Sequence, residues 1–341
     1  MTQEFISLLA SVLAFGITAA LGIKVIPWLH QLKYGQTIKE IGPTWHEKKQ
    51  GTPTMGGIMF MVGIVGALAV CLPLYYYLQQ KGVIASYYET QGYWIRMIAG
   101  VLMALLFGAV GFLDDYIKVI KKQNDGLTPG QKMIFMILIS GGFLATLAML
   151  GDASVTSIPF LGDVNVGFLF YPISMFMIVG FVNAVNLTDG IDGLCSSVTF
   201  FAAIIFIMIA GMRSMFGMSV FSAAVAGGCL GFLVWNFFPA KVFMGDTGSL
   251  FLGGLFCAIA YGVNMPVLIP LVGIIYLCEA GSVMLQVSYF KITHGKRIFK
   301  MSPIHHHFEM CGWSEVKIVW SFSLITLIAG VIAVALTMAL R

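Results

Sequence analysis

The sequence predicts an all-α polytopic membrane protein with about ten transmembrane helices. Of its 341 residues, 59% are hydrophobic and only 10% are charged, whereas a soluble domain carries about 25% charged residues. The mean hydropathy of +0.92 agrees with this. A water-soluble globular enzyme and a disordered chain are therefore excluded. The six cysteines show no paired spacing, which excludes a disulfide-built scaffold and favours buried reduced thiols.

Ten apolar runs approach the length needed to cross the hydrocarbon core, which takes about 20 residues of helix. They lie near residues 5–27, 56–77, 97–113, 133–150, 166–185, 194–212, 218–235, 249–264, 266–285 and 318–340. Since each apolar helix must pack on its neighbours, we expect one integral membrane domain over residues 1–341. The 39 glycines permit close approach of these helices.

The basic residues are divided unequally between alternate loops. Fifteen of the 19 Lys and Arg residues fall on one side, which the positive-inside rule assigns to the cytoplasm. Both termini are then expected outside the cytoplasm. In the outer segment Val155 to Val166, the turn residues Pro159 and Gly162 indicate a possible small periplasmic hairpin. Most acidic residues lie in the inward loops, so any chemistry is expected at the cytoplasmic mouth.

Asp114 and Asp115 follow directly on the third apolar run. Two adjacent carboxylates repel each other and call for a cation, which is either Lys118 one turn later or a bound metal ion. A solvated helix end with an ion pair and a metal site are both compatible with the spacing.

The inward segment after the fifth apolar run carries polar residues at steps of three. They are Asn183, Asn186, Asp189 and Asp192. On a helix these lie close in pairs and form a polar wall. Gly190 and Gly193 leave the backbone open to a phosphate or sugar near the next helix start. The alternative is an Asp-Gly turn with a structural role only.

A third inward segment runs from Phe243 to Ser249 and contains Asp246 in an Asp-Thr-Gly-Ser sequence. Aspartic proteases need two such loops in a β-rich fold, and this chain has one copy between apolar helices. A single carboxylate among small residues at a helix start suits Mg²⁺, which keeps water and phosphate oxygens as its other ligands. We therefore predict Asp246 as a metal ligand.

The last inward loop contains His305, His306 and His307 in succession. Successive residues on a regular helix are about 100 degrees apart, so a zinc site would need a distorted loop. The alternative is that these side chains donate to phosphate or sugar oxygens. Both interpretations remain open from spacing alone.

Five motifs together carry a resemblance to a known family. They are Thr52-Pro53-Thr54-Met55-Gly56-Gly57, Asp114-Asp115, Asn186 to Gly193, Phe243 to Ser249 and His305 to Glu309. They occur in the order found in the bacterial phospho-N-acetylmuramoyl-pentapeptide-transferase family, within the polyprenyl-phosphate sugar-1-phosphate transferases. The resemblance covers essentially the whole chain, and the histidine run favours this family over the N-acetylglucosamine-1-phosphate branch.

The resemblance implies a reaction and its participants. UDP-MurNAc-pentapeptide and undecaprenyl phosphate would give lipid I and UMP with Mg²⁺, at the cytoplasmic face of the bacterial inner membrane, for peptidoglycan synthesis. The partners implied are these two substrates, the lipid bilayer and a second copy in a homodimer. The net charge of +4 is too small to indicate nucleic-acid binding.

The resemblance also implies roles for individual residues. Asp246 would bind Mg²⁺, and Asp114 would guide or deprotonate the attacking lipid phosphate with Asp115 beside it. The other implied substrate contacts are Lys49, Thr54, Lys118, Lys122, Lys132, Asn183, Asn186, Asp189, Gly190, Ile191, Asp192, Asn236, Phe243 and Gln286. The three histidines would contact the sugar phosphates or the peptide-bearing sugar, and Phe243 would stack on uracil.

A secondary transporter is the alternative of a different class. Its ionisable residues should lie near the middle of the membrane on broken helices. Here they lie at the inward ends of the apolar runs, with Glu279 as the exception. We expect Glu279 to be paired with a helix neighbour or to line a lipid groove.

Overall fold

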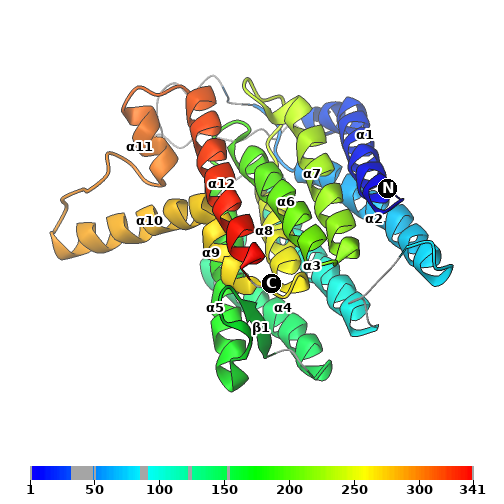
Figure 1. Cartoon of the computed structure of the whole chain (residues 1–341). Coiled ribbons are helices and arrows are strands. Elements are labelled where there is room, and N and C mark those ends of the chain that lie inside the picture. Colours follow the sequence, from blue (N-terminus) through cyan, green and yellow to red (C-terminus); the bar gives the residue numbers. More distant parts are fainter. Residues whose placement is uncertain are drawn as a thin grey trace.

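The computed structural model describes residues 2–31, 49, 51–84, 91–121, 125–151 and 154–339, and these are mostly helical (Figure 1). The first helices are α1 (Thr2–Gln31), α2 (Gly57–Gln80), α3 (Gln91–Lys121) and α4 (Pro129–Met149). After a hairpin of β1 (Val155–Ile158) and β2 (Gly162–Asn165) and the 3-10 turn η2 (Gly167–Leu169) come α5 (Phe170–Thr188), α6 (Leu194–Met212), α7 (Phe216–Asn236) and α8 (Gly245–Gly262). The chain continues through the 3-10 turn η3 (Pro266–Leu268), α9 (Ile269–Val272), α10 (Ile274–Ile292), α11 (Ile304–Met310) and α12 (Glu315–Met338).

The all-α polytopic class predicted from the sequence is confirmed. Within the described residues, eight helices are long and apolar enough to cross a membrane, namely α1 to α7 and α12. The bent segment formed by η3, α9 and α10 adds a ninth if it counts as one span. The eighth expected run, 249–264, corresponds to α8, which is not among these helices. The count of ten and the outward placement of both termini remain predictions.

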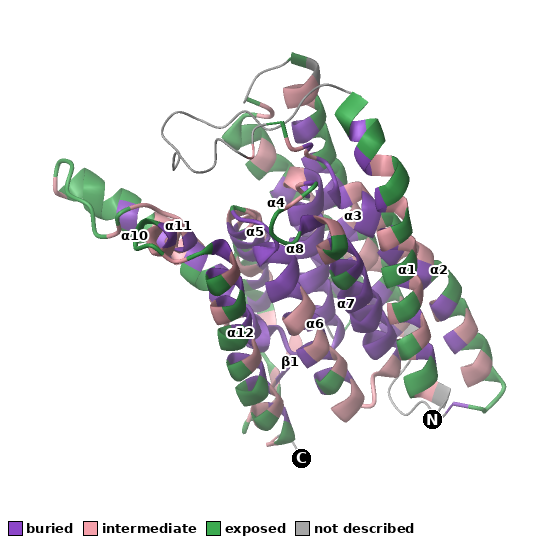
Figure 2. Cartoon of the chain, turned by 90° about the horizontal axis from the view of Figure 1, so that it is seen from above, coloured by how far each residue is buried: buried purple, intermediate pink, exposed green. Residues whose placement is uncertain are grey.

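Helix α8 lies at the centre of the bundle. All residues of its segment Thr247–Gly262 are buried, and it packs mainly against α3 and α5. Helix α7 packs against α1 and α6, and α12 covers α6 on the other side. Figure 2 shows the buried residues concentrated on these central helices, with exposed residues on the outer ones. The core thus fixes the position of the polar first turn of α8.

Two glycine contacts bring the start of α8 against its neighbours. A Cβ at Gly111 of α3 would lie 2.1 Å from the Asp246 carbonyl oxygen, and one at Gly57 of α2 would lie 2.3 Å from the Gly248 Cα. Side chains at these positions would separate the helices, because such distances are far inside van der Waals contact. The glycines therefore allow α2, α3 and α8 to converge at one end.

The apolar run expected over 266–285 is helical, but it is bent. Residues Pro266–Val272 and Ile274–Ile292 meet at an angle of 74°. The break falls at Gly273, and the preceding short helices carry Pro266 and Pro270 in their first turns. Proline is favoured at a helix start, and glycine is a poor helix former, so a new helix direction begins here. As a result α10 leaves the bundle (Figure 1).

The hairpin expected over 155–166 is confirmed. Strand β1 pairs antiparallel with β2, with Val155 opposite Asn165 and Ile158 opposite Gly162. Gly162 has φ of +74°, a conformation that glycine adopts without steric cost. Arg213, at the turn between α6 and α7, donates to the Ser157 hydroxyl at 2.8 Å and ties the hairpin to the bundle.

The six cysteines are free. Cys71, Cys195, Cys229 and Cys257 are buried, as expected for reduced thiols in apolar helices. The expectation is wrong for Cys278 and Cys311, which are exposed. Cys278 lies near the start of α10, where Ile275, Tyr276 and Glu279 are buried, so its exposure shows that it lies on the outward face of the helix.

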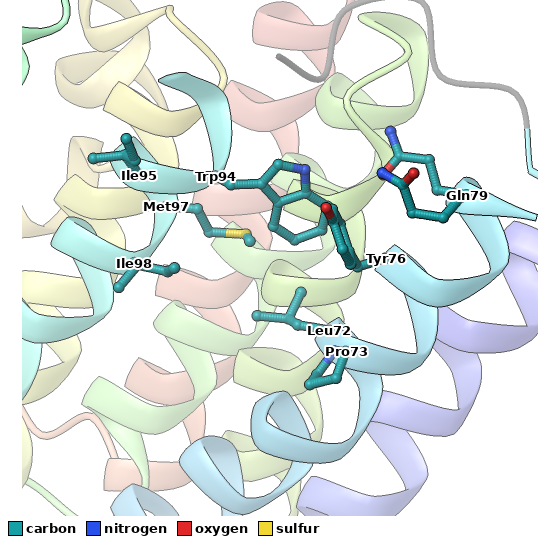
Figure 3. A pocket seen from close by; sticks show the side chains of 9 residues that line it. Leu72, Pro73, Tyr76, Gln79, Trp94, Ile95, Met97 and Ile98 are labelled. Atoms are coloured by element: carbon teal, nitrogen blue, oxygen red, sulfur yellow. The ribbon is translucent and has the colours of Figure 1, made fainter. Parts of the chain in front are cut away.

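A cavity of about 670 Å³ opens between α2 and α3, and Figure 3 shows the side chains around it. It is lined by apolar and aromatic residues such as Leu72, Tyr76 and Trp94, with Gln79 and Gln80 at one end. No residue singled out from the sequence lines this cavity. The polar residues of interest are gathered elsewhere, at the first turn of α8.

Candidate functional site

Three carboxylates meet where α3 ends and α8 begins. Asp114, Asp115 and Asp246 each offer an oxygen, and these oxygens lie within 4.8 Å of one another. Asp114 is fully buried, whereas the Asp246 side chain is 19% exposed. We call these three residues the acidic cluster. In the described part of the chain no other group of three or more His, Cys, Asp or Glu residues has such a geometry.

Asp115 holds the first turn of α8. Its carboxylate accepts hydrogen bonds from the Thr247 backbone N–H at 2.9 Å and from the Thr247 hydroxyl at 2.7 Å. The Asp246 backbone N–H donates to it at 3.3 Å. A helix N-terminus has unpaired N–H groups and attracts negative charge, so this contact fixes the helix start. Gly245, just before, has φ of +69°, and a Cβ there would meet both Asp115 and the Thr54 hydroxyl.

Two lysines neutralise part of the acidic cluster. Lys118, one turn after Asp114, lies 2.5 Å from the Asp114 carboxylate and 3.5 Å from that of Asp246. Lys132 of α4 lies 3.1 Å from Asp114 and 2.5 Å from Asp246. The ion pair foreseen with Lys118 is therefore present, and a second lysine joins it.

The start of α4 places Lys132 in this position. The Thr128 hydroxyl accepts from the Gln131 N–H while the Gln131 side chain accepts from the Thr128 N–H, which is a capping box. The Leu127 N–H donates to Asp114 at 2.7 Å, which joins the loop before α4 to α3. The segment Leu127 to Gln131 thus fixes both Lys132 and its partner Asp114.

The asparagines of α5 divide between two environments. Asn186 donates to Asp246 at 3.0 Å and to the Ser249 hydroxyl at 2.8 Å, so it borders the acidic cluster. Asn183 donates instead to the Val179 carbonyl at 2.8 Å and to the Met136 sulfur at 3.1 Å. The polar wall expected from the spacing therefore includes Asn186 but not Asn183.

A second charged group lies at the turn between α5 and α6. Lys49 is 2.7 Å from Asp192 and 2.6 Å from Glu315, the first residue of α12. Glu315 also accepts from the Asp192 N–H at 2.9 Å, and Asp192 accepts from the Ala240 N–H at 2.8 Å. We call Lys49, Asp192 and Glu315 the lysine bridge. It joins three distant parts of the chain, and the Ala240 N–H adds a fourth.

Asp189 is buried near the negative charges of both groups. Burial raises the pKa of its carboxyl well above the usual value, and the negative charges of Asp246, Asp115 and Asp192 raise it further. Asp189 therefore lies within electrostatic range of both groups. A cation bound here would favour its ionised form.

The segment before α8 is held by backbone hydrogen bonds. The Phe243 N–H donates to the Pro53 carbonyl at 2.9 Å, and the Gly56 N–H donates to the Phe243 carbonyl at 2.8 Å. Asn236 is buried and donates to the Val242 carbonyl at 2.9 Å. Two of the motifs noted in the sequence thus pair directly. Phe243 is half-buried.

His305 is fully buried rather than open to solvent. Its Nδ1 lies 3.0 Å from the Glu279 carboxylate of α10, and neither side chain is exposed. Glu279, for which we expected a partner or a place beside a lipid groove, thus has its partner on α11. A Cβ at Gly190 would lie 2.2 Å from His305 Nε2. Only glycine at 190 admits this imidazole, so His305 packs on the turn between α5 and α6.

The other two histidines have partners of their own. His306 Nδ1 lies 2.6 Å from Glu309, and His307 Nδ1 accepts from the Lys300 N–H at 3.1 Å. Gln286 accepts from the N–H groups of residues 298 and 299, at 3.0 Å each. Helix α11 is regular, and the described residues show no arrangement in which its three histidines face one ion.

Several residues of the site were not singled out from the sequence. Glu315 lies outside every motif, whereas Thr247, Ser249 and Glu309 lie inside the motifs but had no role assigned to them. Glu315 had one local signal, because Ser314 accepts from the Lys317 N–H and caps α12. Ile191 is buried in the core, and Lys122 lies outside the described residues.

Comparison with known proteins places the chain in a family. Residues 97–264 match glycosyl transferase family 4, and residues 49–61 match the first phospho-N-acetylmuramoyl-pentapeptide-transferase signature. The phospho-N-acetylmuramoyl-pentapeptide-transferase of Acetivibrio thermocellus is 44% identical over 95% of this chain and 94% of its own length. The enzymes of that name from Clostridium perfringens strain SM101 and Listeria monocytogenes serotype 4b strain CLIP80459 are each 46% identical, over 96% and 94% of this chain and 95% of their own lengths. The chain belongs to the phospho-N-acetylmuramoyl-pentapeptide-transferase family.

Proposed function

We propose that this chain transfers phospho-N-acetylmuramoyl-pentapeptide from its UDP-linked precursor to undecaprenyl phosphate, giving lipid I and UMP for peptidoglycan synthesis. The observation that carries this proposal is the acidic cluster, with Lys118 and Lys132 against it and the lysine bridge beside it. Both substrates are phosphate anions, and one is a lipid. A site of carboxylates and lysines at the end of membrane-spanning helices suits their meeting.

The charges of the site support a divalent cation. Asp114, Asp115, Asp189 and Asp246 are four acidic groups, whereas Lys118 and Lys132 are two basic ones. The raised pKa of Asp189 means that its ionised form needs a cation nearby. With all six groups ionised, two negative charges remain, which one Mg²⁺ would balance. Mg²⁺ binds one or two carboxylates and keeps its other positions for water and phosphate oxygens. Asp246 is the ligand we propose first, because it is the most exposed of the acidic cluster.

The reaction forms one phosphorus–oxygen bond and breaks another. An oxygen of the lipid phosphate bonds to the phosphorus that carries the sugar, and the bond from that phosphorus to UMP breaks. Bound Mg²⁺ would neutralise charge on the diphosphate. Lys118 and Lys132 stabilise the negative charge of the transferred group, since they already lie between Asp114 and Asp246.

The two aspartates of α3 take different roles. Asp114 is fully buried and contacts both lysines, so we propose that it sets their direction and guides the attacking phosphate electrostatically. The Asp115 carboxylate accepts hydrogen bonds from the N-terminus of α8 and thereby orients Asp246. Asn186 donates to Asp246 Oδ1, whereas Lys118 and Lys132 contact Asp246 Oδ2. The cluster is thus organised before any substrate arrives.

The nucleotide is proposed to lie against the lysine bridge. Lys49, Asp192 and the turn at Gly190 would bind the uridine, with the Phe243 ring stacked on uracil. Stacking a base on an aromatic ring is worth about 1 to 3 kcal/mol. Thr54, Asn236 and Gln286 would support this pocket. His305 would act through the turn on which it packs, and His306 and His307 would border the sugar.

The setting is proposed to be the bacterial inner membrane, with the site on the cytoplasmic face and a homodimer as the assembled form. The unequal division of basic residues between loops supports this orientation.

The test is a UMP-release assay in nanodiscs that contain undecaprenyl phosphate. With Mg²⁺ present, we expect release from UDP-MurNAc-pentapeptide and none from UDP-N-acetylglucosamine. Release from the second nucleotide alone would contradict the proposed donor. Release that is unchanged by a chelator would contradict the proposed metal.

A further inference from the structure

The end of α10 and the loop after it carry an unusual combination of side chains. Basic residues follow one another on this segment: Lys291, Lys296, Arg297 and Lys300. All four are exposed. From Ala280 to Phe308 the sequence contains no Asp or Glu. We call residues 289–300 the α10 tip.

The cations of the α10 tip lack carboxylate partners, unlike those of the site. Lys49, Lys118 and Lys132 all lie against aspartates. In the tip, the Arg297 guanidinium donates to the Lys300 carbonyl at 3.3 Å, and Lys300 Nζ donates to the Met310 carbonyl at 3.0 Å. No ion pair of a tip cation occurs within the part of the chain that the structure describes. Among the described residues, no carboxylate therefore compensates their charge.

Large apolar side chains are exposed beside these cations. Ile292 is 77% exposed, and Phe290 and Ile298 are 43% and 49% exposed. Earlier on α10, Met284 and Leu285 are also exposed. Along this helix apolar residues thus give way to basic ones. A membrane-bound segment shows this change at the level where hydrocarbon meets head groups.

The α10 tip is folded rather than extended. The Gln286 side chain accepts from two N–H groups of the returning chain, and Gly295 has φ of +116° at the reversal. Arg297 and Lys300 are consequently brought back toward α10. Figures 1 and 2 show this arm standing away from the bundle, so its cations are free to meet a surface.

We propose that the α10 tip binds the phosphate head groups of anionic phospholipids in the surrounding membrane. Its cations meet the phosphates while Phe290, Ile292 and Ile298 enter the acyl boundary. This contact holds the arm that carries Glu279 and leads to α11. The proposal does not depend on the reaction assigned above.

The test is hydrogen–deuterium exchange of the full chain in neutral phosphatidylcholine nanodiscs, with and without phosphatidylglycerol. One surface cation is worth about fivefold in membrane binding, so exchange over 289–300 should slow by at least about that factor with the anionic lipid. The protection should disappear near 1 M salt, where the Debye length is about 3 Å. Equal exchange in both nanodiscs would overturn the proposal.

A charge-matched pair of variants makes the test specific. The tip variant is Lys291→Gln, Lys296→Gln, Arg297→Gln and Lys300→Gln. The control variant is Lys24→Gln, Lys121→Gln, Lys241→Gln and Lys317→Gln. The tip variant should lose the lipid-dependent protection and the control variant should keep it, with exchange in α8 unchanged in both. Loss of protection in both variants would show an effect of net charge and overturn the proposal.

Two further arms identify the source of the phosphate. Neutral nanodiscs with inorganic phosphate should give no protection, and protection there would indicate a free-anion site instead. Neutral nanodiscs with a small amount of undecaprenyl phosphate should give less protection than phosphatidylglycerol. Protection by undecaprenyl phosphate alone would make the tip part of the substrate site and overturn the assignment to phospholipid.

Discussion

The acidic cluster and the α11 histidines are both groups of polar residues that belong to the sequence motifs, but they are built differently. In the cluster, three carboxylates face one another and share two lysines, and Asp246 remains partly exposed. On α11, His305 and His306 lie against Glu279 and Glu309, His307 contacts the Lys300 N–H and the Cys311 sulfur, and His305 with Glu279 is fully buried. Surplus negative charge is suited to a metal and phosphates, whereas paired and buried groups fix a backbone. We infer that the cluster performs the chemistry and that α11 positions the turn at Gly190.

The largest effect is expected when the acidic cluster loses Asp246. Asp246→Asn removes one charge and keeps the side-chain volume, so transfer should fall by about a thousandfold, as for loss of a metal or transition-state contact. UMP release in nanodiscs measures this. Asp163→Asn in the β1–β2 hairpin is the control and should retain the normal rate. Normal transfer by Asp246→Asn would refute its role.

A smaller loss is expected at Lys132. Lys132→Gln removes the contacts to Asp114 and Asp246, and the remaining lysine keeps part of the neutralisation. We expect kcat to fall by about a hundredfold, the loss typical of one charge-stabilising donor. Lys121→Gln, an exposed basic residue on α3, should behave as the unmodified chain. An equal loss in both variants would mean that only general charge matters.

Loss of the buried pair Glu279–His305 should reduce the stability of the protein before it affects transfer. Glu279→Ala leaves His305 buried without its partner, which costs about 1 to 3 kcal/mol. Thermal unfolding in detergent should show a lower Tm, and Glu279→Gln should restore most of it. If transfer is abolished in Glu279→Gln while Tm is unchanged, His305 belongs to the chemistry and the division between the two regions fails.

The smallest effect is expected at the lysine bridge. Glu315→Gln weakens the hold on Lys49 and on the Asp192 N–H. The KM for UDP-MurNAc-pentapeptide should rise by about tenfold, because this is the effect of losing one charge-assisted hydrogen bond. The kcat and the KM for undecaprenyl phosphate should stay the same. A change in kcat with constant KM would place Glu315 in the transfer step instead.

The sequence predicted the local parts of this structure well, because local patterns determine them. Apolar runs located the helices, and the turn residues around Gly162 located the hairpin. Only the resemblance to the family suggested that Asp114 and Asp246 lie close together. The bend at Gly273 was missed because an apolar run looks the same whether or not the helix continues in one direction.

Contacts between distant positions could not be predicted from spacing. Glu315 meets Lys49 across 266 positions, and nothing local to either residue indicates it. The pairing of Glu279 with His305 was missed for a similar reason, since α10 and α11 come together only through the folded loop between them. The histidine run left a zinc site and phosphate contacts both open, because the burial of His305 is a property of the tertiary structure.

The most direct test of the central claim is Mn²⁺ binding, measured by electron paramagnetic resonance on the protein in nanodiscs without substrate. We expect one bound Mn²⁺ that Mg²⁺ displaces, lost in Asp246→Asn and retained in His305→Asn. Binding that survives Asp246→Asn but disappears in His305→Asn would place the metal on α11 and contradict the account.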